Sequence, residues 1–190
     1  MIARILVLSA FSTFAGAAMA FQGAVRPAQE KPKDPFEVKA ALMVLLARHV
    51  TWPEKAFERK DSPLKIGLIG KDRFGDHLDK LKGKAVDSHK IEIRRDMDPE
   101  KLKDCQIVMV SDSEDGRLEE ILEVFRGKPT LALGDSKGFG KRGVGINFFD
   151  QEVDGKKTIS WELNTEALKK AALTPSGKLL EIEEKRKNRP

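Results

Sequence analysis

The sequence is poor in cysteine and in aromatic residues. Its 190 residues include one cysteine, two tryptophans and no tyrosine. A single cysteine, Cys105, cannot form a disulfide within the chain, which excludes the small disulfide-rich folds of exported proteins. Cys105 directly precedes the apolar run Gln106–Val110. We therefore expect it to be a buried free thiol and not a catalytic nucleophile.

The chain also lacks a large excess of charge of either sign. It has 35 Lys and Arg against 30 Asp and Glu, which gives a formal net charge of +5. This excess is small beside the total number of charges, so the charge gives no argument for a nucleic-acid partner, and we expect none.

Long apolar runs are missing after residue 20, where the longest, Ala40–Ala47, has eight residues. The first twenty residues differ, because Arg4 precedes an apolar stretch that ends at Ala18-Met19-Ala20. This pattern predicts a cleavable signal peptide over residues 1–20 and a periplasmic protein. The alternative is an uncleaved membrane anchor, but the apolar core is short for a span of about 20 residues.

We expect a disordered segment over residues 21–33, which have two prolines and little periodicity. A single domain should follow over residues 34–186. It opens with a helix, since Asp34 can cap it, Pro35 suits its first position and Glu37 completes a capping box. The helix is apolar on nearly all sides, which predicts that it is largely buried. It should end near Trp52, because Pro53 disfavours a helical residue before it.

Strand and helix patterns alternate through the middle of the chain. Such alternation predicts an α/β fold, a three-layer αβα sandwich around a mainly parallel sheet. Two later strands joined by a polar connection predict a C-terminal antiparallel hairpin. Two helices follow, capped by Asn164 and Ser176. The expected strands are residues 64–69, 90–95, 106–111 and 129–134, and those of the hairpin are 144–149 and 157–163.

No arrangement of residues typical of an enzyme appears in the sequence. Gly138-Phe139-Gly140-Lys141-Arg142-Gly143 matches the G-x-G-x-x-G motif, but a strand follows it, whereas a dinucleotide-binding motif must open a helix. The three histidines have no metal-ligand spacing, and no pair of carboxylates stands out as an acid–base couple. We therefore predict no catalytic residues, no metal and no cofactor.

Three basic residues lie where the expected strands end. Lys71 and Arg73 follow the first strand and Arg94 lies near the end of the second. Ligands of open parallel sheets bind beyond the carboxyl ends of the strands, so these residues are candidates for binding a small anion. The alternative is that they are ordinary solvated charges.

Eight short stretches follow one another in a recognisable order: Val38–Leu42, Val50–Pro53, Ile66–Gly70, Cys105–Val108, Leu133–Asp135, Gly145–Phe148, Trp161–Asn164 and Lys178–Leu180. Taken in this order, they resemble the sequence of the YfiR family. The resemblance implies an exported regulator, not an enzyme, that represses an inner-membrane diguanylate cyclase through the periplasmic domain of that cyclase, and so affects cyclic di-GMP and biofilm formation. Family disulfides have no counterpart here, because Cys105 is alone.

Two classes of function are compatible with the sequence. The first is a protein-binding repressor of a membrane signalling protein, with a second copy of the chain as another candidate partner. The alternative is a small-ligand binding module that acts as a sensor of a nucleotide or another anion. We expect partner contacts from the first helix and from the C-terminal region, with both lysines exposed, unless the apolar members belong to the core. The candidates are Phe36, Lys39, Leu42, Leu46, Trp161, Lys178, Leu179 and Ile182.

Overall fold

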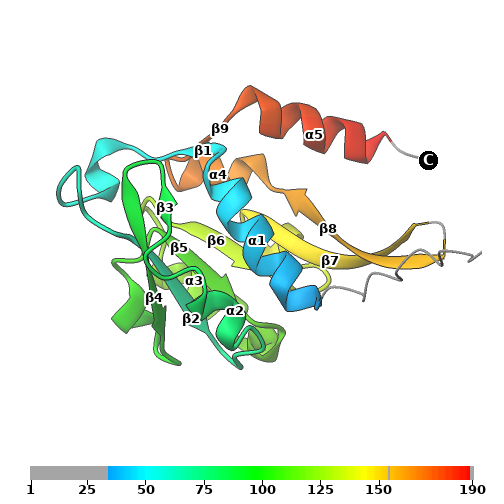
Figure 1. Ribbon diagram of the computed structural model, residues 1–190, viewed down its shortest axis with the longest axis horizontal. Helices are drawn as coiled ribbons and strands as arrows, with labels where there is room; N and C mark the ends of the chain where they lie inside the picture. The colour runs from blue at the N-terminus through cyan, green and yellow to red at the C-terminus, as the bar shows by residue number, and fades with distance from the viewer. Residues whose placement is uncertain (1–33, 154, 189–190) are drawn as a thin grey trace, which may run out of the picture. The chain divides into compact units, whose positions relative to one another are not determined.

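A computed structural model describes residues 34–153 and 155–188 and contains a seven-stranded sheet (Figure 1). Five strands run parallel, in the spatial order β4, β2, β5, β6, β7. The edge strands β3 and β8 are antiparallel to their neighbours. An α/β fold with a mainly parallel sheet is therefore confirmed. The strands are β2 (Leu64–Ile69), β3 (Ala85–Val86), β4 (His89–Arg95), β5 (Ile107–Val110), β6 (Leu131–Gly134), β7 (Ile146–Val153) and β8 (Lys156–Leu163).

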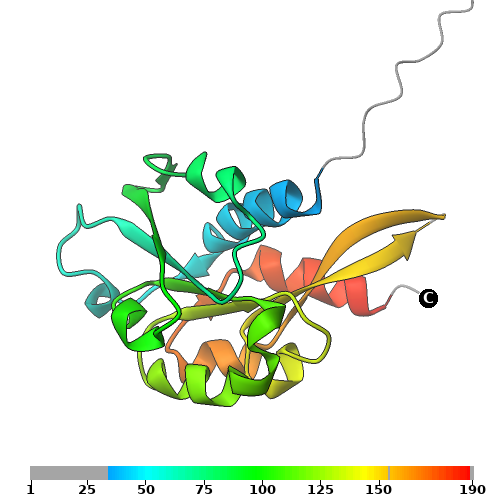
Figure 2. The ribbon, with the colours of Figure 1, turned by 90° about the horizontal axis from the view of Figure 1, so that it is seen from below.

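Helical segments pack on both faces of this sheet, and Figure 2 shows α1 and α3 on opposite sides. One core cluster joins the sheet to α1 (Pro35–Ala47), α2 (Asp76–Asp79), α4 (Thr165–Lys170) and α5 (Gly177–Lys187). A second cluster joins the other face to the 3-10 helix η2 (Pro99–Leu102) and to α3 (Leu118–Val124). Cys105 belongs to the second cluster and is 2% exposed, and burial raises the pKa of its thiol to about 11. A thiol with that pKa is protonated near neutral pH and chemically quiet.

Helix α1 begins as the sequence predicts but ends earlier. The Asp34 carboxylate accepts a hydrogen bond from the Phe36 amide at 2.8 Å. The helix ends at Ala47, so the predicted end near Trp52 is wrong. The reason is a two-stranded antiparallel sheet in which β1 (Val50–Thr51) pairs with β9 (Thr174–Pro175), which joins the end of α1 to the start of α5.

Helix α1 is also less buried than its apolar sequence suggests. Its inward side consists of Lys39, Ala40, Met43, Leu46 and Ala47. These positions fall three or four residues apart, which places them on one side of a helix. The expectation that the whole helix is largely buried is therefore wrong, and apolar residues lie on its outer side.

The predicted signal peptide and the predicted disordered segment lie outside the described residues. Within residues 34–153 and 155–188, none of the helices combines the length and the apolar character that crossing a bilayer requires.

Candidate functional site

A cavity of about 800 Å³ lies beyond the carboxyl ends of β5 and β6. We call it the strand-end crevice. It is bounded by the first turns of α1, by the segments that follow β5 and β6, and by β7 and β8. The loop after β6 carries the glycine-rich motif found in the sequence. The charged and amide side chains that line the crevice are Lys39, Arg73, Asp112, Asp135, Lys137, Lys141, Asn147, Asp150 and Glu162.

A buried ion pair forms one wall of the strand-end crevice. Lys39 Nζ lies 3.5 Å from Asp135 Oδ2, and the two side chains are only 8% and 3% exposed. The ammonium also lies over the Phe36 ring, 4.9 Å from its centroid. Lys39 is therefore not exposed, and the expectation that it lies on the surface is wrong. Its ammonium is compensated by Asp135, which makes burial of both charges tolerable.

Asp135 is held by more than Lys39. Its Oδ1 accepts a hydrogen bond from the Asp112 amide at 3.0 Å. Burial raises the pKa of Asp135, and the neighbouring Asp112 carboxylate adds to this effect, while Lys39 opposes it. The result is a carboxyl group that gains a proton more readily than an exposed aspartate does.

Only one of the three basic residues proposed as ligand-binding lines the strand-end crevice. Arg73 does, and its Nη1 lies 2.9 Å from Asp112 Oδ2. The Lys71 side chain is exposed outside the lining. Arg94 pairs instead with Asp104, at 2.6 Å between Nη1 and Oδ1. Sequence position alone therefore predicted the correct end of the strands but not which residues line the cavity.

Asn147 on β7 is the most buried polar residue of the crevice, at 1% exposure. Its Nδ2 donates to the Ser136 carbonyl at 3.0 Å and to Glu162 Oε1 at 3.1 Å. Both partners are acceptors, so the orientation of the amide is fixed by these bonds. Its Oδ1 is buried and has no hydrogen-bond partner among the described residues. Buried acceptors without a partner are rare in folded proteins.

The glycine-rich motif shapes the loop over this amide. Gly138 and Gly143 have φ values of +90° and +110°, which favour glycine over other residues. A Cβ atom at Gly140 would collide with the Glu162 carboxylate. The motif therefore serves a tight loop that ends before β7, and it does not open a helix as a dinucleotide-binding motif would.

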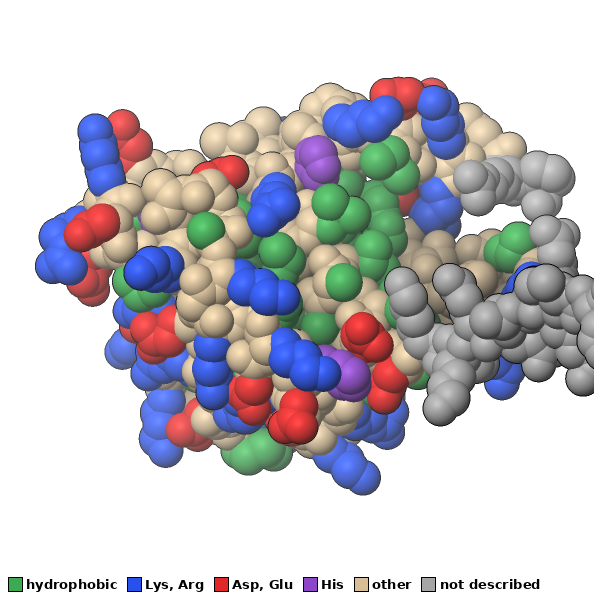
Figure 3. All heavy atoms as spheres, viewed as in Figure 1, with side chains coloured by type: hydrophobic (Ala, Val, Ile, Leu, Met, Phe, Trp, Pro, Cys, Tyr) green, Lys and Arg blue, Asp and Glu red, His purple; other side chains and the backbone are tan. Residues whose placement is uncertain are grey.

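A second feature is apolar and lies on the surface of α1 and α5. We define the α1–α5 surface as Val38, Leu42 and Leu45 of α1 with Leu180 and Ile182 of α5. Leu45 is 50% exposed, Leu180 42% and Ile182 39%. Figure 3 shows hydrophobic side chains gathered over α1 and toward α5, with lysine and arginine side chains around them. Leu45 and Leu180 were not among the contact residues predicted from the sequence, although the three-to-four residue spacing of the inward positions of α1 and α5 could have identified them.

The proposed partner-contact residues differ in accessibility. Leu46 and Leu179 are buried, at 3% and 0% exposure, because they pack in the core beneath the two helices. Together with Lys39 they are not available to a partner. Phe36, Leu42 and Trp161 are partly buried against the core, whereas Lys178 and Ile182 are exposed.

Helix α5 contacts the rest of the domain partly through a buried carboxylate. Glu183 is 4% exposed, and Arg186 donates to both of its oxygens at 2.8 Å. Burial opposes ionisation of Glu183, but the hydrogen bonds from Arg186 and from the Leu163 amide outweigh it and lower the pKa of this carboxyl. The Glu183 carboxylate thus connects α5 to Leu163, the last residue of the edge strand β8.

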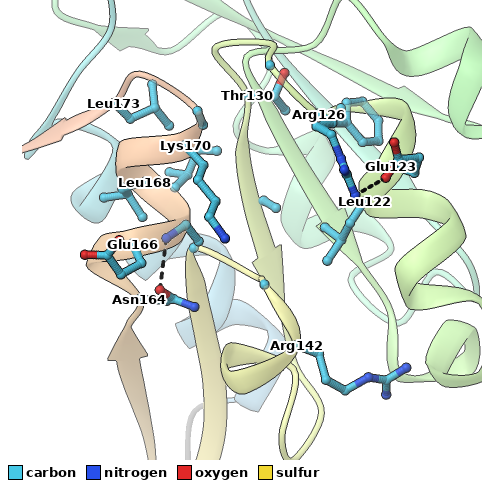
Figure 4. A pocket seen from close by; sticks show the side chains of 18 of the residues that line it. Leu122, Glu123, Arg126, Thr130, Arg142, Asn164, Glu166, Leu168, Lys170 and Leu173 are labelled. Atoms are coloured by element: carbon cyan, nitrogen blue, oxygen red, sulfur yellow. Dashed lines mark hydrogen bonds and ion pairs between the residues drawn. The ribbon is translucent and has the colours of Figure 1, made fainter.

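A groove of about 730 Å³ lies between α3 and α4 (Figure 4). Several of its polar groups have partners of their own: Glu123 pairs with Arg126, and Asn164 accepts the Ala167 amide at 2.9 Å. Leu122, Leu168 and Leu173 form apolar parts of its wall. No buried polar atom without a partner lines this groove among the described residues. Its chemistry therefore indicates no particular ligand.

Comparisons with known proteins agree with the family resemblance. A family model described as YfiR/HmsC-like matches residues 36–183. The fold is similar to the crystal structure of a conserved domain protein from Vibrio cholerae O1 biovar El Tor strain N16961, with a TM-score of 0.56 and 10% sequence identity. That match covers 77% of this chain but 58% of the other, so this chain spans little more than half of its length. No curated protein gives a significant match.

Proposed function

Because the chain belongs to the YfiR/HmsC-like family, which is known for periplasmic regulation of diguanylate cyclases, we propose that it represses a membrane signalling enzyme by direct contact. The enzyme proposed is a diguanylate cyclase of the inner membrane. The contact is made with its periplasmic domain, and repression lowers cyclic di-GMP and biofilm formation. The family is periplasmic, which supports the proposal that the chain works in the same compartment as such a domain.

The observation that carries this proposal is the α1–α5 surface. Leucine and isoleucine side chains on two helices are 39–50% exposed, although residues of these types are usually buried in the core. Exposed apolar residues grouped in this way are typical of protein-interaction sites. Lys178 and Lys185 flank the α5 part of the surface, and both pair with Glu181 of the same helix. The surface therefore offers an apolar centre and a charged edge, as interfaces commonly do.

Export is part of the proposal. We propose that residues 1–20 are removed and that the mature chain starts near Phe21, with one domain over residues 34–186. Intact-mass measurement of the exported protein tests this step. Recovery of the full-length chain with Met1 in the membrane fraction would contradict it.

Gene deletion and capture together test the repressor function. Deletion should raise cellular cyclic di-GMP, and the mature protein should capture the periplasmic domain of a membrane signalling protein. Unchanged cyclic di-GMP together with no captured signalling protein would contradict the proposal. Light scattering of the purified protein shows whether it forms a dimer, and loss of the dimer in Leu45→Glu would assign the α1–α5 surface to a second copy instead.

The strand-end crevice favours a second candidate function, that of a small-ligand sensor. Its support is the cavity at the strand ends, whose lining includes the exposed lysines Lys137 and Lys141. Native mass spectrometry of the protein isolated from its own cells should detect a bound small molecule. A measured mass equal to that of the mature chain alone would count against this function.

A further inference from the structure

The backbone groups of β8 point alternately toward β7 and toward the free edge of the sheet. Strand β8 is the last of the seven strands, so β7 is its only neighbour in the sheet. The Asn164 amide, just after β8, donates to the Gly145 carbonyl at 2.8 Å, on the β7 side. The preceding Leu163 amide donates to the Glu183 carboxylate instead. Because successive residues of a strand alternate in this way, the odd-numbered residues of β8 face the edge.

Three residues of β8 therefore present unpaired backbone groups at this edge. They are Lys157, Ile159 and Trp161, whose N–H and C=O groups have no hydrogen-bond partner within residues 34–153 and 155–188. A row of such groups can pair with a strand of another chain, and folded proteins usually keep it covered.

Helix α5 covers this edge but is attached to it by few contacts. Figure 1 shows α5 alongside β8, and the Glu183 carboxylate accepts the Leu163 amide where a neighbouring strand would offer a carbonyl. Arg186 lies over the Phe149 ring, 5.8 Å from its centroid. Only Leu179 and Glu183 of the eleven residues of α5 are buried. All four ion pairs that α5 forms among the described residues lie within the helix, so they persist if it moves.

We propose that α5 is a detachable cover of β8, and that its release lets two copies of the chain join through their β8 strands. The two strands run antiparallel, with Ile159 opposite Ile159 of the second copy. This register pairs all three edge residues, because Lys157 then lies opposite Trp161. It also places Lys156 opposite Glu162 on each side of the symmetry axis, and opposite charges that face each other across strands are stabilising. This complementarity favours a second copy as the occupant, and the inference does not depend on the repressor function.

Glu183→Ala tests the cover, because it removes the acceptor of the Leu163 amide. Sedimentation equilibrium of the mature protein should show a dimer dissociation constant at least about tenfold lower in this variant than in the unaltered protein. Glu184→Ala, on the exposed side of the same helix, should leave the constant unchanged. Equal constants in the three proteins would overturn the proposal.

Ser176→Ala provides a second way to release α5 if Glu183→Ala does not fold. The Ser176 hydroxyl caps the helix by accepting the Leu179 amide at 3.2 Å. Its loss should favour the dimer in the same direction. A monomer at all concentrations in this variant as well would overturn the proposal.

Lys157→Pro tests the edge itself. Proline has no N–H, and the N–H of Lys157 has no partner in the single copy, so the substitution suits an edge strand. Added to Glu183→Ala, it should weaken the dimer at least about tenfold, whereas Lys157→Gln, which keeps the N–H, should weaken it much less. A dimer that Lys157→Pro leaves unchanged would show that the copies join elsewhere.

Cysteine substitutions test the register. Directly opposed residues of a hydrogen-bonded pair have Cα atoms about 5.5 Å apart, a separation that suits a disulfide. In Glu183→Ala protein, oxidised glutathione should link Ile159→Cys into a dimer. It should not link Lys157→Cys, because Lys157 lies opposite Trp161 and Cys105 is buried. Cross-linking of Lys157→Cys without cross-linking of Ile159→Cys would overturn the proposed pairing.

Discussion

Helices α1 and α5 each hide a charge and expose apolar residues, but they do so in sequences of opposite character. Helix α1 is almost entirely apolar, and its buried charge is Lys39. Helix α5 is mostly charged, and its buried charge is Glu183. Lys39 pairs with Asp135, which directly follows strand β6, whereas Glu183 pairs with Arg186 of its own helix.

The difference between the two ion pairs predicts how firmly each helix is held in the domain. Removal of Asp135 would leave the Lys39 ammonium buried in the domain, because both side chains are at most 8% exposed. The partner of Glu183 is Arg186, whose side chain is 27% exposed. Removal of Glu183 would therefore leave a guanidinium group that water can hydrate. We therefore expect α1 to be fixed firmly to the strand ends and α5 to be held more weakly. In both helices the exposed apolar residues lie outside the core, so they can contact the proposed partner.

The largest effect is expected from Asp135→Ala. It leaves Lys39 without its counter-ion, and breaking a buried pair in this way costs about 3–5 kcal/mol of the free energy of unfolding. Urea denaturation measures this loss. Adding Lys39→Met to Asp135→Ala should recover part of it, because no buried charge remains.

Asp61→Ala is the control for this variant. Asp61 pairs with Arg59, and both side chains are more than three quarters exposed, so the free energy of unfolding should change little. Equal losses in Asp61→Ala and Asp135→Ala would contradict the account of the buried pair.

A smaller effect is expected from Glu183→Ala. The substitution removes the acceptor of the Leu163 amide and the partner of Arg186, and we expect a loss of about 1–3 kcal/mol in the free energy of unfolding. Glu184→Ala on the exposed side of α5 should change it much less. If Glu183→Ala destabilises the protein more than Asp135→Ala does, the proposed order of the two helices is wrong.

We expect the contributions of Asp135 and Asp72 to the free energy of unfolding to change with pH in opposite directions. The pKa of Asp135 is raised by burial, so its contribution to stability is present below the unfolded pKa, about 4, and is lost as pH rises through the folded pKa. Burial would also raise the pKa of Asp72, but hydrogen bonds from Gly75 and Arg95 outweigh it and lower this pKa. The contribution of Asp72 is therefore present above the unfolded pKa and is lost as pH falls.

Unfolding of Asp135→Asn and Asp72→Asn across this pH range measures both contributions. The stability of the unaltered protein relative to Asp135→Asn should fall as pH rises, and its stability relative to Asp72→Asn should rise. Slopes of the same sign would contradict the assignment of the two environments.

The sequence predicted those parts of the fold that depend on neighbouring residues. Strand β2 was found at the predicted residues, and Asn164 and Ser176 cap α4 and α5 as expected. These features depend on local patterns, namely an apolar run and a capping side chain next to its helix. The two-residue strands β1 and β9 were missed, because each is too short to show a periodicity and their pairing joins distant parts of the chain.

The candidate site was predicted less well for the same reason. Lys39 was predicted to be exposed, because nothing near it in the sequence indicates Asp135 as a partner. Arg73 was assigned to the correct edge of the sheet, since strand ends can be located from apolar runs. Asn147 gave no signal, because it lies within a strand and only its neighbours in space leave its Oδ1 unpaired.

The smallest effect on stability, and the most informative effect on function, is expected from Leu45→Glu. Leu45 is 50% exposed, so the free energy of unfolding should change by only about 0.5 kcal/mol. The new charge should nevertheless disrupt an apolar contact made through the α1–α5 surface. Met97→Glu is the matched control, because Met97 is 54% exposed and lies outside this surface.

Cellular cyclic di-GMP in a deletion strain that carries each of these variants is the most direct test of repression through the α1–α5 surface. We predict that the unaltered protein and Met97→Glu restore low cyclic di-GMP, whereas Leu45→Glu, at equal periplasmic abundance, leaves it at the level of the deletion. Full repression by Leu45→Glu would contradict the claim that this surface makes the contact.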